Sequence, residues 1–387
     1  MMSKKKLSDI AVITMGQSPS SETYNTNGIG LPFFQGKADF GVIHPSVRVY
    51  CDKPQKKAQA NDILMSVRAP VGATNIADQS CCIGRGLAAI TAMPGVSFHK
   101  YVYYFLKYCE KEIEDMGVGS TFKAISRKDL ESVQISMFPL DVQMKIADIL
   151  DRAAALIETR KAQIAKMDLL VISQYAKMFG GNPEDSMWEK VQLVEICKSQ
   201  NDIKCGPFGT LLYNADYRKE GIPIYGIPQV NSSFEKKPSE FVELEKAQEL
   251  NAFSLMHGDI VMSRKGNVGT CAIFPKDMEQ GIMHSDVLRV RVDREKMNPI
   301  FLAEQLHNSQ YVQWQIEQVS HGAIMAGTNV TKLKGIVIEN PPIDLQNNFA
   351  SFVHSVDRTK SELQRGMVKL EMLYRSLMQK CFKGETF

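Results

Sequence analysis

Long hydrophobic runs are missing from this chain of 387 residues, and no apolar stretch approaches the roughly 18 residues that a membrane-spanning helix needs. The basic start, Lys4 to Lys6, is not followed by the apolar segment of a secretory signal peptide. We therefore expect a soluble, cytoplasmic protein with no membrane partner. The hydrophobic content of 44% and the charged content of 23% are ordinary for a globular protein, and the length suffices for two or three domains.

Paired cysteines and histidines are also missing. The eight cysteines form no CxxC motif, and Cys81 and Cys82 are adjacent, which suits neither a disulfide nor a four-ligand metal site. The seven histidines include no HExxH motif. We expect free thiols in a reducing compartment, with no metal site and no cofactor of the chain's own.

Catalytic motifs are present only as incomplete matches. Residues 340–342 are the Asn-Pro-Pro of amino-methyltransferases, but Ile343 replaces the aromatic residue that normally follows, and no glycine-rich cofactor loop precedes it. Residues 30–37 are one residue too long for a phosphate-binding loop, and residues 84–86 are too short for a dinucleotide fingerprint. There is no credible Ser-His-Asp set or pair of catalytic carboxylates, so the sequence predicts a protein that is not an enzyme by itself.

The sequence does contain a long internal repeat. Residues 139–143 (Pro-Leu-Asp-Val-Gln) match residues 342–346 (Pro-Ile-Asp-Leu-Gln), and residues 62–72 match residues 259–269. The repeat length of about 200 residues is far above the roughly 20–50 residues of solenoid repeats. The chain is therefore predicted to be a duplicated module, a globular part followed by a long helix.

The expected elements follow the same order in both copies. We predict strands over residues 41–50, 63–67 and 87–91 and a helix from Phe98 to about Met116 in the first copy. Strands at 260–263 and 287–292, followed by a helix from Pro299 to about Gln318, are their counterparts. This agreement in order weighs against a chance similarity.

The two long helices carry apolar residues at intervals of seven. These rows predict a coiled-coil seam made of Leu150, Ile157, Ile164, Val171 and Met178 in the first helix and of Phe349, Val356, Leu363, Leu370 and Leu377 in the second. Two identical modules related by a two-fold axis would place these helices antiparallel. About 38 helical residues at 1.5 Å each give a rod on the order of 55 Å.

We therefore predict an α+β fold in which two similar mixed α/β domains are joined by two long antiparallel coiled-coil helices, with a pseudo-two-fold internal repeat. The predicted boundaries are residues 1–139 for the first domain, 140–181 for the central helix, 182–341 for the second domain and 342–387 for the C-terminal helix.

The net charge of +3 is unevenly distributed. Residues 1–139 contain 16 basic and 12 acidic residues, whereas residues 182–341 contain 17 basic and 21 acidic ones. Any DNA-binding surface in the second domain must therefore be a local patch. Arg68 and Lys265 occupy aligned places after the matching strands, where a cation suits a phosphate or a guanine edge. The candidate DNA-binding residues in the loops are Gln35, Lys37, Arg68, Arg85, Ser120, Thr121, Lys123, Gln229, Asn231, Arg264, Lys265, His321 and Asn329.

Several of these segments together carry a family resemblance. They are residues 31–36 (Leu-Pro-Phe-Phe-Gln-Gly), 62–72, 84–87, 119–123 (Gly-Ser-Thr-Phe-Lys) and the Pro-x-Asp-x-Gln start of each long helix. In this order, around two long helices, the chain resembles the specificity subunit of a type I restriction–modification system over nearly its whole length. The second copy departs from the pattern, because residues 320–323 (Ser-His-Gly-Ala) replace the Gly-Ser-Thr loop.

The resemblance implies that each domain is a target-recognition domain for one half of a bipartite sequence in double-stranded DNA. The paired helices would set the length of the unread gap and dock two modification (methyltransferase) subunits. Motor and nuclease restriction subunits would complete the assembly, and S-adenosylmethionine, ATP and Mg would be used by these partners.

One alternative of another class remains open at this level. The chain could be a two-headed coiled-coil scaffold that binds proteins without DNA specificity, and the acidic second domain favours that reading. The sequence also leaves open which loop residues contact bases and which contact phosphates.

Overall fold

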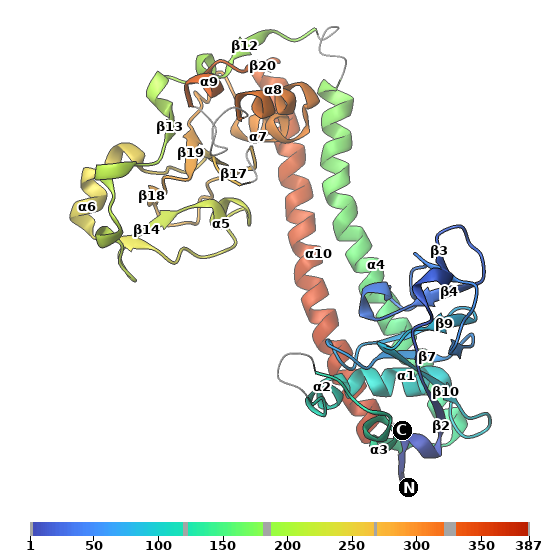
Figure 1. The fold of residues 1–387 in the computed structure, drawn as a ribbon. Coiled ribbons are helices and arrows are strands. Elements are labelled where there is room, and N and C mark those ends of the chain that lie inside the picture. The colour runs from blue at the N-terminus through green and yellow to red at the C-terminus, as the bar shows by residue number, and fades with distance from the viewer. Residues whose placement is uncertain (1–2, 119–122, 181–186, 267–268, 321–329, 386–387) are drawn as a thin grey trace. The chain divides into compact units, whose positions relative to one another are not determined.

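The computed structural model describes residues 3–118, 123–180, 187–266, 269–320 and 330–385 (Figure 1). The chain forms two compact units. Unit 1 comprises residues 1–162 and 365–387, and unit 2 comprises residues 163–364. The long helices α4 (Leu140–Phe179) and α10 (Ile343–Lys383) each contribute residues to both units.

The described residues of unit 1 form three small sheets. An antiparallel sheet has the strand order β2-β10-β7-β8, a second has the order β3-β5-β4-β9-β6, and β1 pairs with β11. The strands are β1 (Ser3–Lys6), β2 (Ala11–Met15), β3 (Tyr24–Asn25), β4 (Leu31–Phe34), β5 (Tyr50–Cys51), β6 (Lys57–Ala58), β7 (Ile63–Ser66), β8 (Thr74–Ile76), β9 (Cys81–Ile83), β10 (Leu87–Ala92) and β11 (Gln134–Met137). The helices are α1 (His99–Tyr108), α2 (Glu110–Asp115) and α3 (Arg127–Ser132), with 3-10 turns at Leu7–Asp9, Ser21–Thr23 and Lys37–Asp39.

Unit 2 repeats this arrangement. Its sheets have the orders β13-β19-β16-β17, β15-β14-β18 and β12-β20. The strands are β12 (Lys190–Gln192), β13 (Ile203–Cys205), β14 (Ile222–Tyr225), β15 (Phe241–Val242), β16 (Ile260–Ser263), β17 (Cys271–Ile273), β18 (Ile282–Met283), β19 (Val287–Val290) and β20 (Val337–Glu339). The helices are α5 (Ile227–Val230), α6 (Leu244–Glu249), α7 (Pro299–Asn308), α8 (Gln310–Ser320) and α9 (Val330–Lys334), with 3-10 turns at Leu193–Ile196, Gln200–Asp202, Gly209–Leu211, Asn214–Asp216 and Asn251–Phe253.

The duplication extends to single backbone hydrogen bonds. Leu7 N donates to Val133 O (2.8 Å) in unit 1, and Leu193 N donates to Ile336 O (2.9 Å) at the matching place in unit 2. Likewise, Gly16 N donates to Leu87 O (2.9 Å), and its counterpart Gly206 N donates to Val287 O (3.0 Å). The turns after β7 and β16 each need a left-handed glycine, Gly72 (φ 93°) and Gly269 (φ 91°). Both units are therefore built on one backbone plan.

Two sequence-based expectations about elements are wrong. Residues 41–50 do not form a strand, because the segment turns back at an isolated bridge between Phe40 and Pro45 and only Tyr50–Cys51 joins a sheet. The single helix expected in each copy is two helices, which break at Cys109 and at Ser309. At both positions the backbone leaves helical geometry, with ψ values of 8° and 111°.

The cores of both units include residues of the long helices. In unit 1, Ile146 and Leu150 near the start of α4 share a core with Met378, Cys381 and Phe382 near the end of α10. The helices therefore run antiparallel in this unit.

In unit 2 the opposite ends of the same helices meet. Phe349 near the start of α10 packs its ring against Tyr175 and Phe179 of α4, with ring centroids 5.9 and 5.4 Å apart. Lys360 Nζ lies 2.5 Å from Asp168 Oδ1 farther along the two helices. These contacts again make the pair antiparallel.

The predicted seam residues differ in burial. Leu150, Ile157, Val171, Phe349 and Val356 are buried, whereas the remaining positions are half-buried, namely Ile164, Met178, Leu363, Leu370 and Leu377. Tyr175 and Phe179 lie outside the predicted rows and are buried against unit 2. Seam residues and additional positions thus both pack on the partner helix and on the globular part, as Phe349 and Tyr175 do with each other and with Phe301.

The glutamine of each Pro-x-Asp-x-Gln segment ties its helix to the globular part. Gln143 and Gln346 are both 0% exposed. The backbone N–H of Phe98 donates to Gln143 Oε1 (2.9 Å), and that of Asn298 donates to Gln346 Oε1 (2.8 Å). Gln346 Nε2 in turn donates to the carbonyl of Pro341 (2.7 Å). The amide therefore satisfies groups on both sides of the junction.

Replacing Gln346 with alanine is expected to lower the free energy of unfolding by about 2 kcal/mol or more, because each buried polar group left unsatisfied costs about 1–3 kcal/mol. Chemical denaturation followed by circular dichroism measures the change. The control is Asn348→Ala, an exposed position on the same helix, where we expect less than about 0.5 kcal/mol. Equal stabilities for the two variants would contradict the role assigned to Gln346.

Candidate DNA interface

A polar cleft of about 270 Å³ lies at one sheet edge of unit 1. It is lined by Ser18, Gln35, Gly36, Lys37, Ser66, Arg68, Ala69, Arg85 and Gly86. The structure thus brings together four of the predicted DNA-binding residues, Gln35, Lys37, Arg68 and Arg85. They come from three loops that are distant in sequence.

Strand pairing explains why these loops meet. β4 pairs in parallel with β9 through Phe34 and Ile83, so the loops that follow both strands leave at the same edge. β10 pairs with β7 in antiparallel register, Leu87 opposite Ser66, so the start of β10 lies beside the end of β7. The segment carrying Lys123 also adjoins this edge, because Ala124 bridges Arg68.

The loop between β9 and β10 is held tightly by its backbone. Gly84 N donates to Phe34 O (2.8 Å), and Val67 N donates to Gly86 O (2.9 Å). A Cβ atom on Gly86 would lie 2.1 Å from the carbonyl oxygen of Gln35. Only glycine fits there, and this close packing turns Arg85 outward to the exposed rim.

The electrostatics of this cleft favour an anion. Lys37, Arg68 and Arg85 are exposed, and none of the described residues that line the cleft is acidic. Asp39 is buried beside it, but its carboxylate accepts from Gln35 N (2.7 Å) and pairs with Arg48. The cluster can therefore contact phosphate oxygens or the O6 and N7 acceptors of guanine.

The ring of Tyr24 adjoins the cleft. Burial raises the pKa of Tyr24, and the hydrogen bond with Gln35 and the charge of Arg85 oppose this shift. Its hydroxyl donates to the carbonyl of Pro19 (2.9 Å), so the phenol is protonated.

Unit 2 has a cleft at the corresponding edge. β14 pairs in parallel with β18, Tyr225 opposite Met283, as β4 pairs with β9 in unit 1. This cleft, of about 330 Å³, is lined by Ile224, Gly226, Ile227, Pro228, Gln229, Ser239, Glu240, His284 and Asp286. Its charge differs from that of the first, since it contains two carboxylates.

The predicted residues of unit 2 are only partly placed as expected. Gln229 is 4% exposed, and its amide accepts from Gly226 N (3.0 Å) and donates to Lys237 O (3.1 Å), which argues against a base contact. Lys265 is exposed but pairs with Asp286, with Nζ 2.6 Å from Oδ1. The guanidinium of Arg264 lies over the ring of Phe208 at 4.6 Å, and Asn231 is exposed near Ser263.

Four predicted residues lie outside the described residues: Ser120, Thr121, His321 and Asn329. Their part in an interface stays a prediction.

Comparisons with known proteins agree with this arrangement. The family model described as type I restriction modification DNA specificity domain matches residues 2–167 and 185–370. The chain belongs to this family.

Curated relatives carry the corresponding names. The chain is 48% identical over 151 residues to the putative type I restriction enzyme MjaX specificity subunit of Methanocaldococcus jannaschii. The aligned residues make up 39% of this chain and 36% of that protein. The chain is 20% identical over 314 residues to the type I restriction enzyme EcoKI specificity subunit of Escherichia coli (strain K12), covering 74% of this chain and 66% of the relative. The chain thus aligns with little more than a third of the MjaX subunit's length.

Solved structures share the fold over nearly the full length. The crystal structure of the type I restriction-modification system S subunit from M. genitalium superposes with a TM-score of 0.61 at 17% identity, covering 99% of this chain and 96% of that one. A structure described as the structural basis of complex assembly and conformational transition of the type I R-M system gives a TM-score of 0.65 at 15% identity, with 98% and 97% coverage. The predicted α+β fold of two similar domains with two long helices is confirmed.

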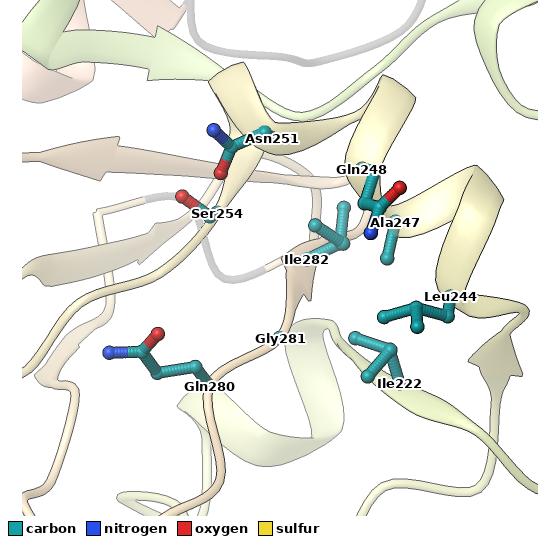
Figure 2. Close-up of a pocket in the computed structure, with 9 residues that line it drawn as sticks. All are labelled: Ile222, Leu244, Ala247, Gln248, Asn251, Ser254, Gln280, Gly281 and Ile282. Atoms are coloured by element: carbon teal, nitrogen blue, oxygen red, sulfur yellow. The ribbon is translucent and has the colours of Figure 1, made fainter.

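Another cleft, in unit 2, differs from the two described above in having no charged side chain in its lining (Figure 2). It measures about 350 Å³ and is lined in unit 2 by Ile222, Leu244, Ala247, Gln248, Asn251, Ser254, Gln280, Gly281 and Ile282. Without a charged side chain, this lining supplies no cation to neutralise a phosphate. The smaller polar clefts are the better candidates for a nucleic-acid interface.

Other chemistry finds little support in the described part of the chain. Its residues include no group of three or more histidine, cysteine, aspartate or glutamate side chains that could hold a metal ion. None of the eight cysteines, all of which lie in described residues, forms a disulfide. None of the described helices is long and apolar enough to cross a membrane.

Sequence reasoning missed Ser18 in unit 1 and Glu240, His284 and Asp286 in unit 2. A second alignment of the two copies, with a different shift, could have found the residues of unit 2. The strands β7 and β16 are related by a shift of 197 residues, whereas a shift of 200 places Gly84-Arg85-Gly86 opposite His284-Ser285-Asp286.

Proposed function

We propose that this chain is the DNA-recognition subunit of a type I restriction–modification complex and that each unit reads one half of a bipartite DNA target. The observation that carries this proposal is the recurrence of one loop framework, at the same sheet edge, in both units. In unit 1 that framework presents Lys37, Arg68 and Arg85 without an opposing carboxylate in the lining. Such a surface fits a DNA groove and its phosphates.

The chain itself is proposed to be non-catalytic. Methyl transfer to adenine would belong to two modification subunits that use S-adenosylmethionine, and translocation and cleavage to motor and nuclease subunits that use ATP and Mg. The proposed domain limits remain 1–139 and 182–341, with residues 140–181 and 342–387 forming helices that set the spacer and dock the modification subunits. The long helices α4 and α10 support this division.

Sequencing of methylated adenines in the host, with and without this gene, tests the function directly. We expect one bipartite methylated sequence that disappears when the gene is deleted. An unchanged methylome would favour the alternative, a coiled-coil scaffold that binds proteins.

Replacing Arg68 with alanine is expected to weaken DNA binding by about 1–3 kcal/mol if the side chain contacts a base. Binding of the chain, purified with its modification subunit, to duplexes of the target sequence measures the loss. The control is Arg127→Ala, an exposed arginine of α3 that pairs with Glu131 and does not line the cleft. Equal affinities of Arg68→Ala and wild type, with the same sequence preference, would remove Arg68 from the interface.

A further inference from the structure

The two recognition clefts share a framework but differ at one equivalent position. Val67 N donates to Gly86 O at 2.9 Å in unit 1, and Arg264 N donates to Asp286 O at 2.9 Å in unit 2. Two residues earlier in each loop, Gly84 N donates to Phe34 O in unit 1 and His284 N donates to Tyr225 O in unit 2. Asp286 is thus the structural counterpart of Gly86.

The loop after the preceding strand accommodates this change. In unit 1 the 3-10 turn is capped by Gly36, two residues after the end of β4, and the carbonyl of Gln35 leaves no room for a Cβ atom on Gly86. In unit 2 α5 is capped by Gly226, directly after β14. The connection from β14 to its helix is thus one residue shorter than the connection from β4 to its turn. The side chain of Asp286 occupies the position where unit 1 has room only for the hydrogen atom of Gly86.

Asp286 changes what the neighbouring cation can do. Lys265, the counterpart of Arg68, has its Nζ 2.6 Å from Asp286 Oδ1. Glu240 adds a second carboxylate to the same lining. Burial raises the pKa of Tyr217 beside this cleft, and the charges of Glu240 and Asp286 add to the shift. A lysine already paired, next to two carboxylates, is poorly suited to gripping phosphates.

His284 fixes the position of Asp286. The backbone N–H of Asp286 donates to His284 Nδ1 at 3.1 Å. The carboxylate of Asp286 is paired with Lys265.

We propose that unit 2 recognises its half-site through Asp286 and Lys265 as an acceptor–donor pair, in which Asp286 accepts a hydrogen bond from the amino group of a base. The chemistry that matches a carboxylate in the major groove is the N4 amino group of cytosine or the N6 amino group of adenine. In either base pair a carbonyl acceptor lies beside that amino group, within reach of the lysine. This inference rests on the proposed function, and it makes Asp286 a specificity-determining residue.

The decisive experiment combines a variant with altered DNA. The chain and its modification subunit are assayed on duplexes in which each cytosine of the unit 2 half-site is replaced by pyrimidin-2-one, or each adenine by purine, so that one amino group is missing. We expect one such replacement to weaken binding of the wild type about tenfold and to leave Asp286→Ala, which lacks any side-chain acceptor, nearly unaffected. The base replaced identifies whether cytosine or adenine supplies the amino group.

Two further variants separate recognition from charge. Asp277→Ala removes one exposed negative charge from unit 2 outside the cleft lining and is expected to keep the wild-type preference at every position. Lys265→Met retains the carboxylate and is expected to lower affinity while the penalty for the missing amino group persists. Together these variants keep the inference testable if Asp286→Ala does not fold.

Failure of the inference differs from failure of the function. If the wild type binds a bipartite target but tolerates removal of every amino group of the unit 2 half-site, Asp286 is not a base acceptor and the proposed function stands. If the wild type shows no sequence preference in either half-site, both proposals are overturned.

Discussion

Removing residues 161–167 from α4 together with residues 360–366 from α10 is expected to shorten the unread gap of the DNA target by about three base pairs and to leave both half-sequences unchanged. Seven residues shorten a helix by about 10 Å, and base pairs are spaced by about 3.4 Å. A deletion of seven also keeps the apolar rows in phase along each helix. The number of base pairs in the unread gap is therefore expected to depend on the length of the two helices.

The two deleted segments are matched across the helix pair. Lys360 Nζ contacts Asp168 Oδ1 at one end, and Arg160 Nη1 lies 2.9 Å from the Cβ position of Gly366 at the other. The Lys360–Asp168 pair is partly exposed, so its loss costs little stability.

Sequencing of methylated adenines in cells that carry this double deletion reads the gap directly. The matched control removes residues 161–167 alone, which shifts one helix against the other and is expected to abolish methylation. A double deletion that methylates the original sequence with the original gap would show that the helices do not set the spacing.

Replacing Phe349 with alanine is expected to lower the free energy of unfolding by about 3–5 kcal/mol, the usual cost of emptying a fully buried phenylalanine site. Its side chain is 0% exposed and packs against Tyr175, Phe179 and Phe301, with ring centroids 5.4 to 6.3 Å away. These rings join both long helices to α7 in unit 2. The cavity left by the truncation is apolar and stays dry, so bound water does not offset the lost packing.

Urea denaturation of the full chain, followed by circular dichroism, measures this loss. Leu373→Ala is the control, because Leu373 lies on the same helix and is 65% exposed. We expect a change below about 0.5 kcal/mol for the control. A similar small change for Phe349→Ala would mean that this aromatic cluster does not stabilise the junction.

Patterns that depend on near neighbours were predicted well. The seven-residue rows identified both long helices, and the Pro-x-Asp-x-Gln repeat marked their first turns, because helical periodicity is a local property of the chain. The prediction for segment 41–50 failed for the opposite reason. Its residues are compatible with a strand, but among the described residues no strand pairs with most of them.

The candidate site was predicted unevenly. Gln35, Lys37, Arg68 and Arg85 were chosen as polar residues of loops, and they do line one cleft. Gln229 was chosen on the same ground and is buried, since its amide closes the turn at Gly226. Residue type and loop position do not distinguish a side chain that closes its own loop from one that faces solvent.

The sequence by itself determined the duplication, the two long helices and the cations that follow the matching strands. The tertiary structure alone decided how those cations are used. Arg68 remains in a cleft without a lining carboxylate, whereas Lys265 meets Asp286, 21 residues further along the chain. The reason is that charge pairing depends on which strand ends lie side by side, and the antiparallel pairing of β16 with β19, Ser263 opposite Val287, brings these two residues together.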